Sequence, residues 1–146
     1  MEIDDRAKDQ TIREIVAEHG MIEGPLLPVL HAVQAEYGCV DEASIRTVAH
    51  ALNLSRAEVH GVVSFYHDFR KLPEPRPILR LCRAEACQAR GSEPLAAWAQ
   101  ARAGSRIAIE TVYCLGLCSA GPNAMIGTDV HARLDRAALG ELIDAL

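Results

Sequence analysis

Apolar residues recur with helical spacing through the first 70 residues of the chain. One such segment opens at "GPLLP" and ends at Gly38, and Asp41 can cap the next one. Ser55 and Glu58 match the capping-box pattern for a fourth helix. The pattern predicts four short amphipathic helices in a compact bundle. The apolar side chains of the fourth are expected to face inward; they are Val59, Val62, Val63 and Tyr66.

The pattern changes after "KLPEPRP", residues 71–77, where three prolines exclude a continuing helix. Beyond it, "PILRLC" (77–82) and "SRIAIETVYC" (105–114) are predicted strands, because apolar and β-branched residues dominate them. A helix capped by Ser92 and ended by Gly104 is predicted between them. A strand–helix–strand unit of this length predicts a right-handed crossover that joins two parallel strands.

The last part of the chain predicts a short hairpin and a closing helix. "NAMIG" and "DVHARL" flank the turn "GTD", and "DRAALGELIDAL" follows with helical spacing. The order βαβ–ββ–α is that of a small thioredoxin-like domain. The predicted fold class is therefore α/β, with a helical bundle over 1–70, a linker over 71–77 and a thioredoxin-like domain over 78–146.

Composition narrows the classes of function. The net charge of −5 disfavours nucleic acid as a partner, and no run of about 18 apolar residues predicts a membrane span. The stretch "MEIDDRAKDQ" is acidic and polar, unlike a signal peptide. We therefore expect a cytoplasmic protein, in which cysteines are not disulfide-bonded by default.

Four of the five cysteines form two close pairs, Cys82 with Cys87 and Cys114 with Cys118. Each pair begins where a predicted strand ends, and Cys39 stands alone far upstream. Because the carboxyl ends of parallel neighbouring strands meet at one edge of a sheet, the four thiols are expected to converge there. Cys39 is interpreted as a small buried apolar residue.

Convergent thiols admit several chemistries. A disulfide is disfavoured by the expected compartment, and a thioredoxin-type dithiol by the absence of C-x-x-C. Four cysteines also satisfy tetrahedral zinc, although zinc sites commonly include a tight C-x2-C turn. The observed C-x4-C and C-x3-C spacings favour the larger 2Fe–2S cluster, and zinc stays the alternative.

Glycines and arginines surround the cysteine pairs. Gly116 and Gly121, and in the same way Gly91, permit positive φ and would let backbone N–H groups turn toward the sulfurs; the alternative is that they only turn the loop. The flanking arginines either tune a cluster's reduction potential or lie on the surface and steer docking; they are Arg80, Arg83 and Arg90.

The complete pattern resembles the thioredoxin-like 2Fe–2S subunit family of NADH-dehydrogenase modules. That family includes the small iron–sulfur subunit of respiratory complex I and its relatives in NAD-linked hydrogenases and formate dehydrogenases. The resemblance covers nearly the whole chain, from "PVLHAVQAEYG" and "EVHGVVSFYHDF" to "ETVYCLGLCSAGPNAMI". It implies one 2Fe–2S cluster and, carried over by position, the ligands Cys82, Cys87, Cys114 and Cys118.

Within that family, "CRAEACQARG" together with "CLGLC" is most similar to the gamma subunit of soluble, molybdenum-containing, NAD-dependent formate dehydrogenase. The resemblance implies a non-catalytic electron-transfer subunit beside an FMN- and NADH-binding partner, with "VVSFYHDF" at or near that interface. Through this partner it would serve a molybdenum-containing catalytic subunit. Alternative functions are the equivalent subunit of complex I or of a hydrogenase, and a redox-silent zinc adaptor. When isolated, the subunit could also form a homodimer.

Overall fold

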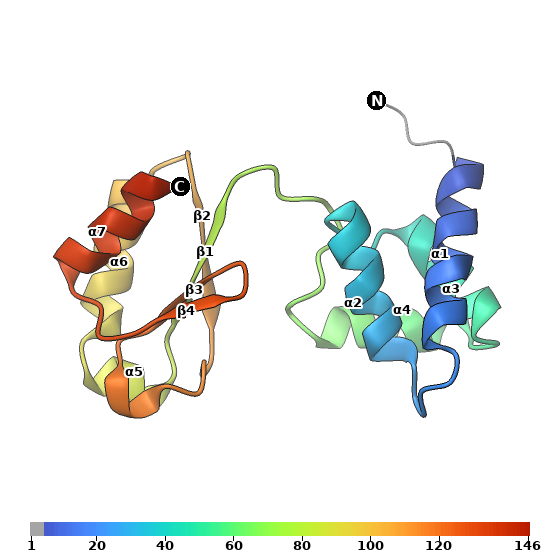
Figure 1. Cartoon of the computed structure of the whole chain (residues 1–146), viewed down its shortest axis with the longest axis horizontal. Helices are drawn as coiled ribbons and strands as arrows, with labels where there is room; N and C mark the ends of the chain where they lie inside the picture. The colour runs from blue at the N-terminus through green and yellow to red at the C-terminus, as the bar shows by residue number, and fades with distance from the viewer. Residues whose placement is uncertain (1–4) are drawn as a thin grey trace. The chain divides into compact units, whose positions relative to one another are not determined.

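The computed structural model describes residues 5–146 and divides the chain into two compact units (Figure 1). We call Met1–Pro73 the helical unit and Glu74–Leu146 the sheet unit. The first four residues, which open the acidic stretch "MEIDDRAKDQ", lie outside the described residues. From residue 5 onward, no helix combines the length and the apolar character needed to cross a membrane.

The helical unit contains the predicted helices. They are α1 (Asp5–His19), α2 (Leu26–Tyr37), α3 (Glu42–Ala51) and α4 (Arg56–Phe65). Gly38 ends α2 with φ 73°, and Asp41 caps α3 by accepting a 2.9 Å hydrogen bond from the Ser44 N–H. Ser55 and Glu58 form both hydrogen bonds of the capping box of α4. The local signals that predict these helix ends are therefore confirmed.

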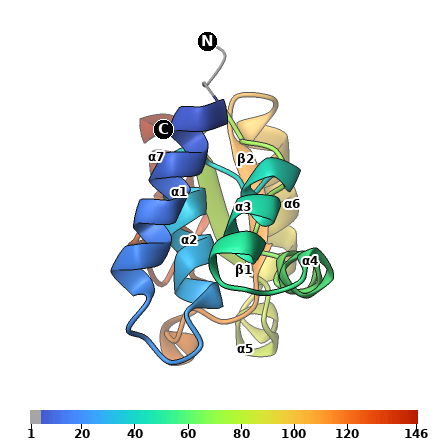
Figure 2. The same cartoon turned by 90° about the vertical axis from the view of Figure 1, so that its right-hand side faces the viewer.

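Apolar side chains from α1 to α4 form the core of this unit, and α1 and α3 lie side by side in Figure 2. Val59 and Val63 are buried as predicted, but Tyr66 is not, with 43% of its surface exposed. The helix ends at Phe65 and Tyr66 adopts an extended conformation, so helical periodicity no longer places its side chain. The inward prediction for Tyr66 is wrong.

The sheet unit has a sheet of the order β2-β1-β3-β4, formed by residues that are all described. Its elements are β1 (Ile78–Cys82), α5 (Glu85–Ala89), α6 (Ser92–Ala103), β2 (Ala108–Val112), the 3-10 turn η1 (Cys118–Ala120), β3 (Ala124–Ile126), β4 (Asp129–His131) and α7 (Arg136–Ala145). Strands β1 and β2 run parallel, whereas β3 pairs antiparallel with both β1 and β4. The predicted parallel pair and hairpin are confirmed.

Helices α6 and α7 pack together and cover one face of the sheet (Figure 1). The buried side chains beneath them form the core of the unit. They include Leu79 and Leu81 of β1, Leu95 of α6 and the α7 residues Leu139 and Ile143. Because β1 lies between β2 and β3, it is anchored on both sides, which fixes the position of its carboxyl end.

Two local features of the sheet unit differ from the prediction. Helix α5 was not predicted, because five residues are too few to show helical periodicity. Ser92 does not cap α6: Gly91 occupies the N-cap position with φ 93°. Ser92 is already inside the helix, and its buried hydroxyl has no hydrogen-bond partner among the described residues.

Candidate metal centre

The register of β1 and β2 brings the four paired cysteines to one end of the sheet. Cys82, the last residue of β1, pairs with Val112, so Cys114 follows just beyond the end of β2. Its backbone N–H donates a 3.3 Å hydrogen bond to Cys82 Sγ. Cys87 lies in α5, which follows β1 directly and lies beyond that end of the sheet in Figures 1 and 2.

The thiols form two pairs that differ in exposure. Cys82 and Cys87, the inner pair, are 2% and 1% exposed, and each shifts the pKa of the other. Cys114 and Cys118, the outer pair, are exposed, with their sulfurs 3.5 Å apart. The pairs also interact with one another, since Cys82 acts electrostatically on Cys118. All four thiols therefore share one site, which is open on the side of the outer pair.

Glycines shape this site in two different ways. Gly116 has φ 82°, and its N–H lies 3.4 Å from Cys114 Sγ, as predicted. Gly121 does not have positive φ, and its φ is −67°. A Cβ at Gly121 would lie only 3.0 Å from Cys87 Sγ, so this position needs glycine for space. Gly91 has positive φ, but its N–H bonds to the Gln88 carbonyl rather than to a sulfur.

Burial and hydrogen bonding act in opposite directions on the inner thiols. Burial raises the pKa of Cys82, but backbone N–H groups, including that of Cys114, outweigh it and lower the pKa below its ordinary value. Burial dominates at Cys87 and raises its pKa. The pKa of Cys118 is raised mainly by its hydrogen bond and charge interaction with Cys114. Of these three thiols, Cys82 is the one whose pKa the surrounding donors lower.

The three flanking arginines are not equivalent. Arg80 Nε lies 3.3 Å from Glu110 Oε2, and Arg83 Nε lies 2.7 Å from Glu93 Oε1. These carboxylates offset much of the positive charge that the two arginines could direct at the thiols. Arg90 is exposed, and its Cδ lies beside Gly121, 3.3 Å from where a Cβ would stand. Of the three, Arg90 is the one whose side chain lies beside Gly121, the glycine next to Cys87 Sγ.

Cys39 lies in the helical unit, whereas the four paired cysteines all lie in the sheet unit. Its side chain is buried, and burial raises the pKa of its thiol. Both observations agree with the interpretation of Cys39 as a small apolar core residue.

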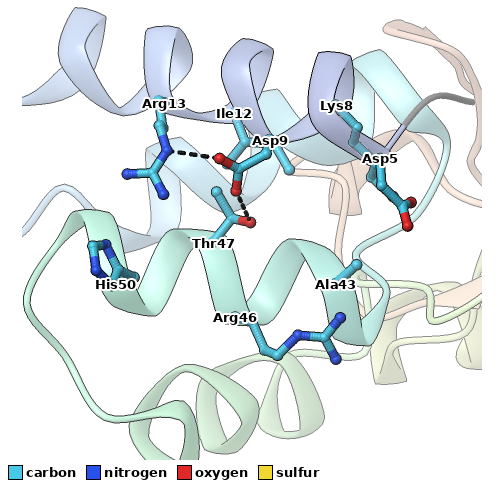
Figure 3. Close-up of a pocket in the computed structure, with 9 residues that line it drawn as sticks. All are labelled: Asp5, Lys8, Asp9, Ile12, Arg13, Ala43, Arg46, Thr47 and His50. Carbon is cyan, nitrogen blue, oxygen red and sulfur yellow. Dashed lines mark hydrogen bonds and ion pairs between the residues drawn. The ribbon is translucent and has the colours of Figure 1, made fainter.

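A cleft of about 330 Å³ lies between α1 and α3 in the helical unit (Figure 3). Asp9 of α1 pairs with Arg13 on the same helix and with Thr47 of α3. Asp9 accepts hydrogen bonds from Arg13 Nε at 2.8 Å and from Thr47 Oγ1 at 2.6 Å. This network joins α3 to α1, and none of the cysteines lines the cleft.

Asn123 is the residue at the site that the sequence pattern did not indicate. Its side chain is buried, and its amide nitrogen lies 3.7 Å from Cys87 Sγ and 2.8 Å from the Leu117 carbonyl oxygen. An asparagine after proline usually indicates a turn. Only its place five residues after Cys118 could have drawn attention to it.

The arrangement of the thiols fits a 2Fe–2S cluster, which takes two thiolates on each of two irons. Two thiol pairs, with backbone N–H groups at the sulfurs and a glycine leaving room beside Cys87, fit that requirement.

The family model for thioredoxin-like [2Fe-2S] ferredoxins matches residues 12–146. The chain belongs to this family. As a member it carries one 2Fe–2S cluster, and the predicted thioredoxin-like fold is confirmed.

Curated relatives of this ferredoxin are subunits of redox complexes. This chain is 29% identical to a subunit of the NADH-quinone oxidoreductase of Escherichia coli (strain K12). The match extends over 127 residues, which are 81% of this chain and 76% of the relative. Identity to the corresponding NADH-quinone oxidoreductase subunit of Rhizobium meliloti (strain 1021) is 31% over 129 residues, 82% and 77% of the two chains. The NADP-reducing hydrogenase subunit HndA of Solidesulfovibrio fructosivorans is 28% identical, over 77% and 71%.

A solved structure shows the same fold. The crystal structure of an air-oxidized NAD+-reducing [NiFe]-hydrogenase matches 82% of this ferredoxin with a TM-score of 0.67 and 25% identity. The match spans 22% of the hydrogenase chain, about a fifth of its length.

Proposed function

We propose that this ferredoxin holds its 2Fe–2S cluster through Cys82, Cys87, Cys114 and Cys118. The observation that carries the proposal is that these thiols meet in two pairs at the carboxyl ends of β1 and β2. Four cysteine thiolates are the usual ligand set of such a cluster. The only other cysteine of the chain, Cys39, is buried in the core of the helical unit.

The side chains around the thiols suit a one-electron carrier. When bound, the cluster supplies reversible one-electron chemistry. The buried inner pair holds one side away from water, while the exposed outer pair gives an electron partner access. The N–H groups of Cys114 and Gly116 point at sulfurs and stabilise negative charge there. We propose that the chain transfers electrons and has no substrate site of its own.

The proposed partner is an FMN- and NADH-binding subunit in the cytoplasm. Support comes from the relatives, which are named as subunits of NADH-quinone oxidoreductase and of an NADP-reducing hydrogenase. Further support comes from "VVSFYHDF", where Phe65 is 75% exposed and stands edge-on to Tyr66 with the ring centroids 5.1 Å apart. Exposed aromatic side chains are typical anchors of protein interfaces.

The finer proposal is that the parent complex is a molybdenum-containing, NAD-dependent formate dehydrogenase. Its support is the resemblance of "CRAEACQARG" with "CLGLC" to the gamma subunit of that enzyme. The test is to purify the native complex through this chain and to compare formate, hydrogen and quinone as electron partners of NAD(H). Formate-dependent NAD reduction supports the proposal, whereas turnover with hydrogen or quinone alone assigns the chain to one of the other complexes.

The ligand assignment predicts which cysteines the cluster needs. Cys87→Ala and Cys118→Ala each remove one thiolate from a different pair, so both variants should lose most of their iron and acid-labile sulfide. Cys39→Ala is the matched control and should keep the wild-type content of about two irons and two sulfides per chain. Metal and sulfide analysis of the purified proteins measures this. A colourless wild type with one zinc per chain would show the redox-silent adaptor instead.

A further inference from the structure

Asn123 is anchored by its backbone to the end of the strand that carries Cys82. Its carbonyl oxygen accepts a 2.9 Å hydrogen bond from the Cys82 N–H. The residue is 1% exposed, so protein atoms rather than water surround its side chain. The backbone contact with one inner cysteine therefore sets where the side chain can reach.

The side-chain amide nitrogen of Asn123 faces two acceptors. One is Cys87 Sγ at 3.7 Å, and the other is the Leu117 carbonyl oxygen at 2.8 Å. A ligating thiolate and a carbonyl both lack a hydrogen to donate, so each needs one N–H of the amide group. This determines which end of the amide points at the sulfur. Asn123 thereby connects the inner pair to the loop between Cys114 and Cys118.

The other end of the amide shows that this orientation is imposed. Asn123 Oδ1 is buried and has no hydrogen-bond partner within residues 5–146. A buried acceptor without a partner is unfavourable and rare in folded proteins. The fold thus retains a polar side chain here although only its donor end is satisfied by the described residues.

We propose that Asn123 is a positioning residue that fastens the outer cysteine loop to Cys87 and raises the reduction potential of the cluster. The inference rests on the proposed function, because it assumes that Cys87 is a ligand.

The expected effect on the potential follows from charge. Reduction adds one negative charge to a cluster whose thiolates are already negative. Hydrogen bonds donated to the sulfurs stabilise the reduced form more than the oxidised form. At Cys87 the effect is larger than at an exposed sulfur, because water cannot replace the lost donor at a residue that is 1% exposed. Removing the amide should therefore weaken electron uptake.

The test compares the holoprotein with Asn123→Leu and Asn123→Ala, both of which remove the donors without adding charge. We expect electron uptake to weaken about three- to tenfold, a shift of roughly 30–60 mV to more negative potential at 59 mV per decade. The midpoint is measured by a redox titration followed by electron paramagnetic resonance. We also expect iron to pass faster to a chelator, because the loop is no longer fastened. The alanine variant covers the case in which leucine does not fit.

The matched control is Ser92→Ala, which removes another buried and unpartnered polar group from the same unit. It should leave both the potential and the rate of iron loss unchanged. The inference is overturned if the Asn123 variants hold a full cluster with the potential and iron-loss rate of Ser92→Ala. Failure of the proposed function looks different, because the wild-type protein itself would then contain no 2Fe–2S cluster.

Discussion

At the scale of residues, the site depends on the space and the hydrogen-bond donor around one sulfur, that of Cys87. Cys87 Sγ is approached by the Asn123 amide and by the backbone at Gly121. Neither role is visible in the sequence, where the stretch "GPN" predicts only a turn. The interpretation of Gly121 through positive φ is wrong. Glycine is needed here because a side chain distant in the sequence, that of Cys87, leaves no room for a Cβ.

Gly121→Ala should disturb the inner pair. The added Cβ would lie 3.0 Å from Cys87 Sγ, and buried Cys87 has little room to retreat. We expect a clear loss of iron per chain and a lower thermal midpoint of the holoprotein, measured by metal analysis and by the visible absorption during heating.

Gly61→Ala provides the contrast. Gly61 lies inside α4, and no described atom outside its own turn lies within 4 Å of an added Cβ. This variant should keep its iron and gain about 0.5–1 kcal/mol of stability. Full iron and an unchanged spectrum in Gly121→Ala would contradict the spatial argument.

The elements were largely predictable, and their shortest pieces were not. The prolines of 71–77 and the apolar periodicities indicate the helices and strands, and the rule for parallel crossovers brings the cysteines together. Helix α5 was not predicted, because five residues are too few to show helical periodicity. Ser92 resembled a cap, but glycine at position 91 can adopt the left-handed conformation that starts α6 one residue earlier. Such shifts depend on tertiary packing.

The junction of α1 and α3 predicts a pH dependence of stability. Burial works against the Asp41 carboxylate, but hydrogen bonds from Lys8 Nζ, at 2.6 Å, and from Ser44 outweigh it and lower its pKa to about 2 from 3.8. Because the pKa of Asp41 is lower in the folded chain than in the unfolded chain, its carboxylate stabilises the fold at pH values above the unfolded pKa. The contribution is lost as the pH falls from 3.8 to about 2.

Asp41→Asn keeps a good N-cap residue and removes the charge. We expect it to lower the free energy of unfolding by about 1–2 kcal/mol at pH 7, a figure reduced for solvent screening of this half-exposed carboxylate. The difference should shrink as the pH falls below 4. Urea unfolding followed by circular dichroism from pH 7 to pH 2.5 measures it, with Glu36→Gln on the exposed face of α2 as the control. A difference that stays constant across this range would refute the assignment.

At the scale of the whole molecule, we assign the proposed electron transfer and partner binding to different units. The sheet unit contains all four proposed ligands, and the helical unit carries the exposed aromatic pair Phe65 and Tyr66. The two activities should therefore respond to different substitutions.

Phe65→Ser should weaken association with the proposed flavin-binding subunit and leave the cluster intact. Truncating an aromatic anchor typically costs about 2 kcal/mol or more, roughly 30-fold in affinity. Pull-down of NADH-oxidising activity through the tagged chain, with iron measured in parallel, tests this. Met21→Ser alters another apolar residue of the same unit, one that is 97% exposed, and should bind normally. Equal capture by both variants would place the interface elsewhere.

The central claim is that four thiols at the end of the sheet hold one 2Fe–2S cluster that accepts a single electron. Low-temperature electron paramagnetic resonance of the dithionite-reduced full chain tests it most directly. We predict about one unpaired spin per chain in the wild type and in Cys39→Ala, and loss of that signal in Cys87→Ala and Cys118→Ala. A wild-type protein that is silent after reduction, or a signal that survives in both ligand variants, would contradict the claim.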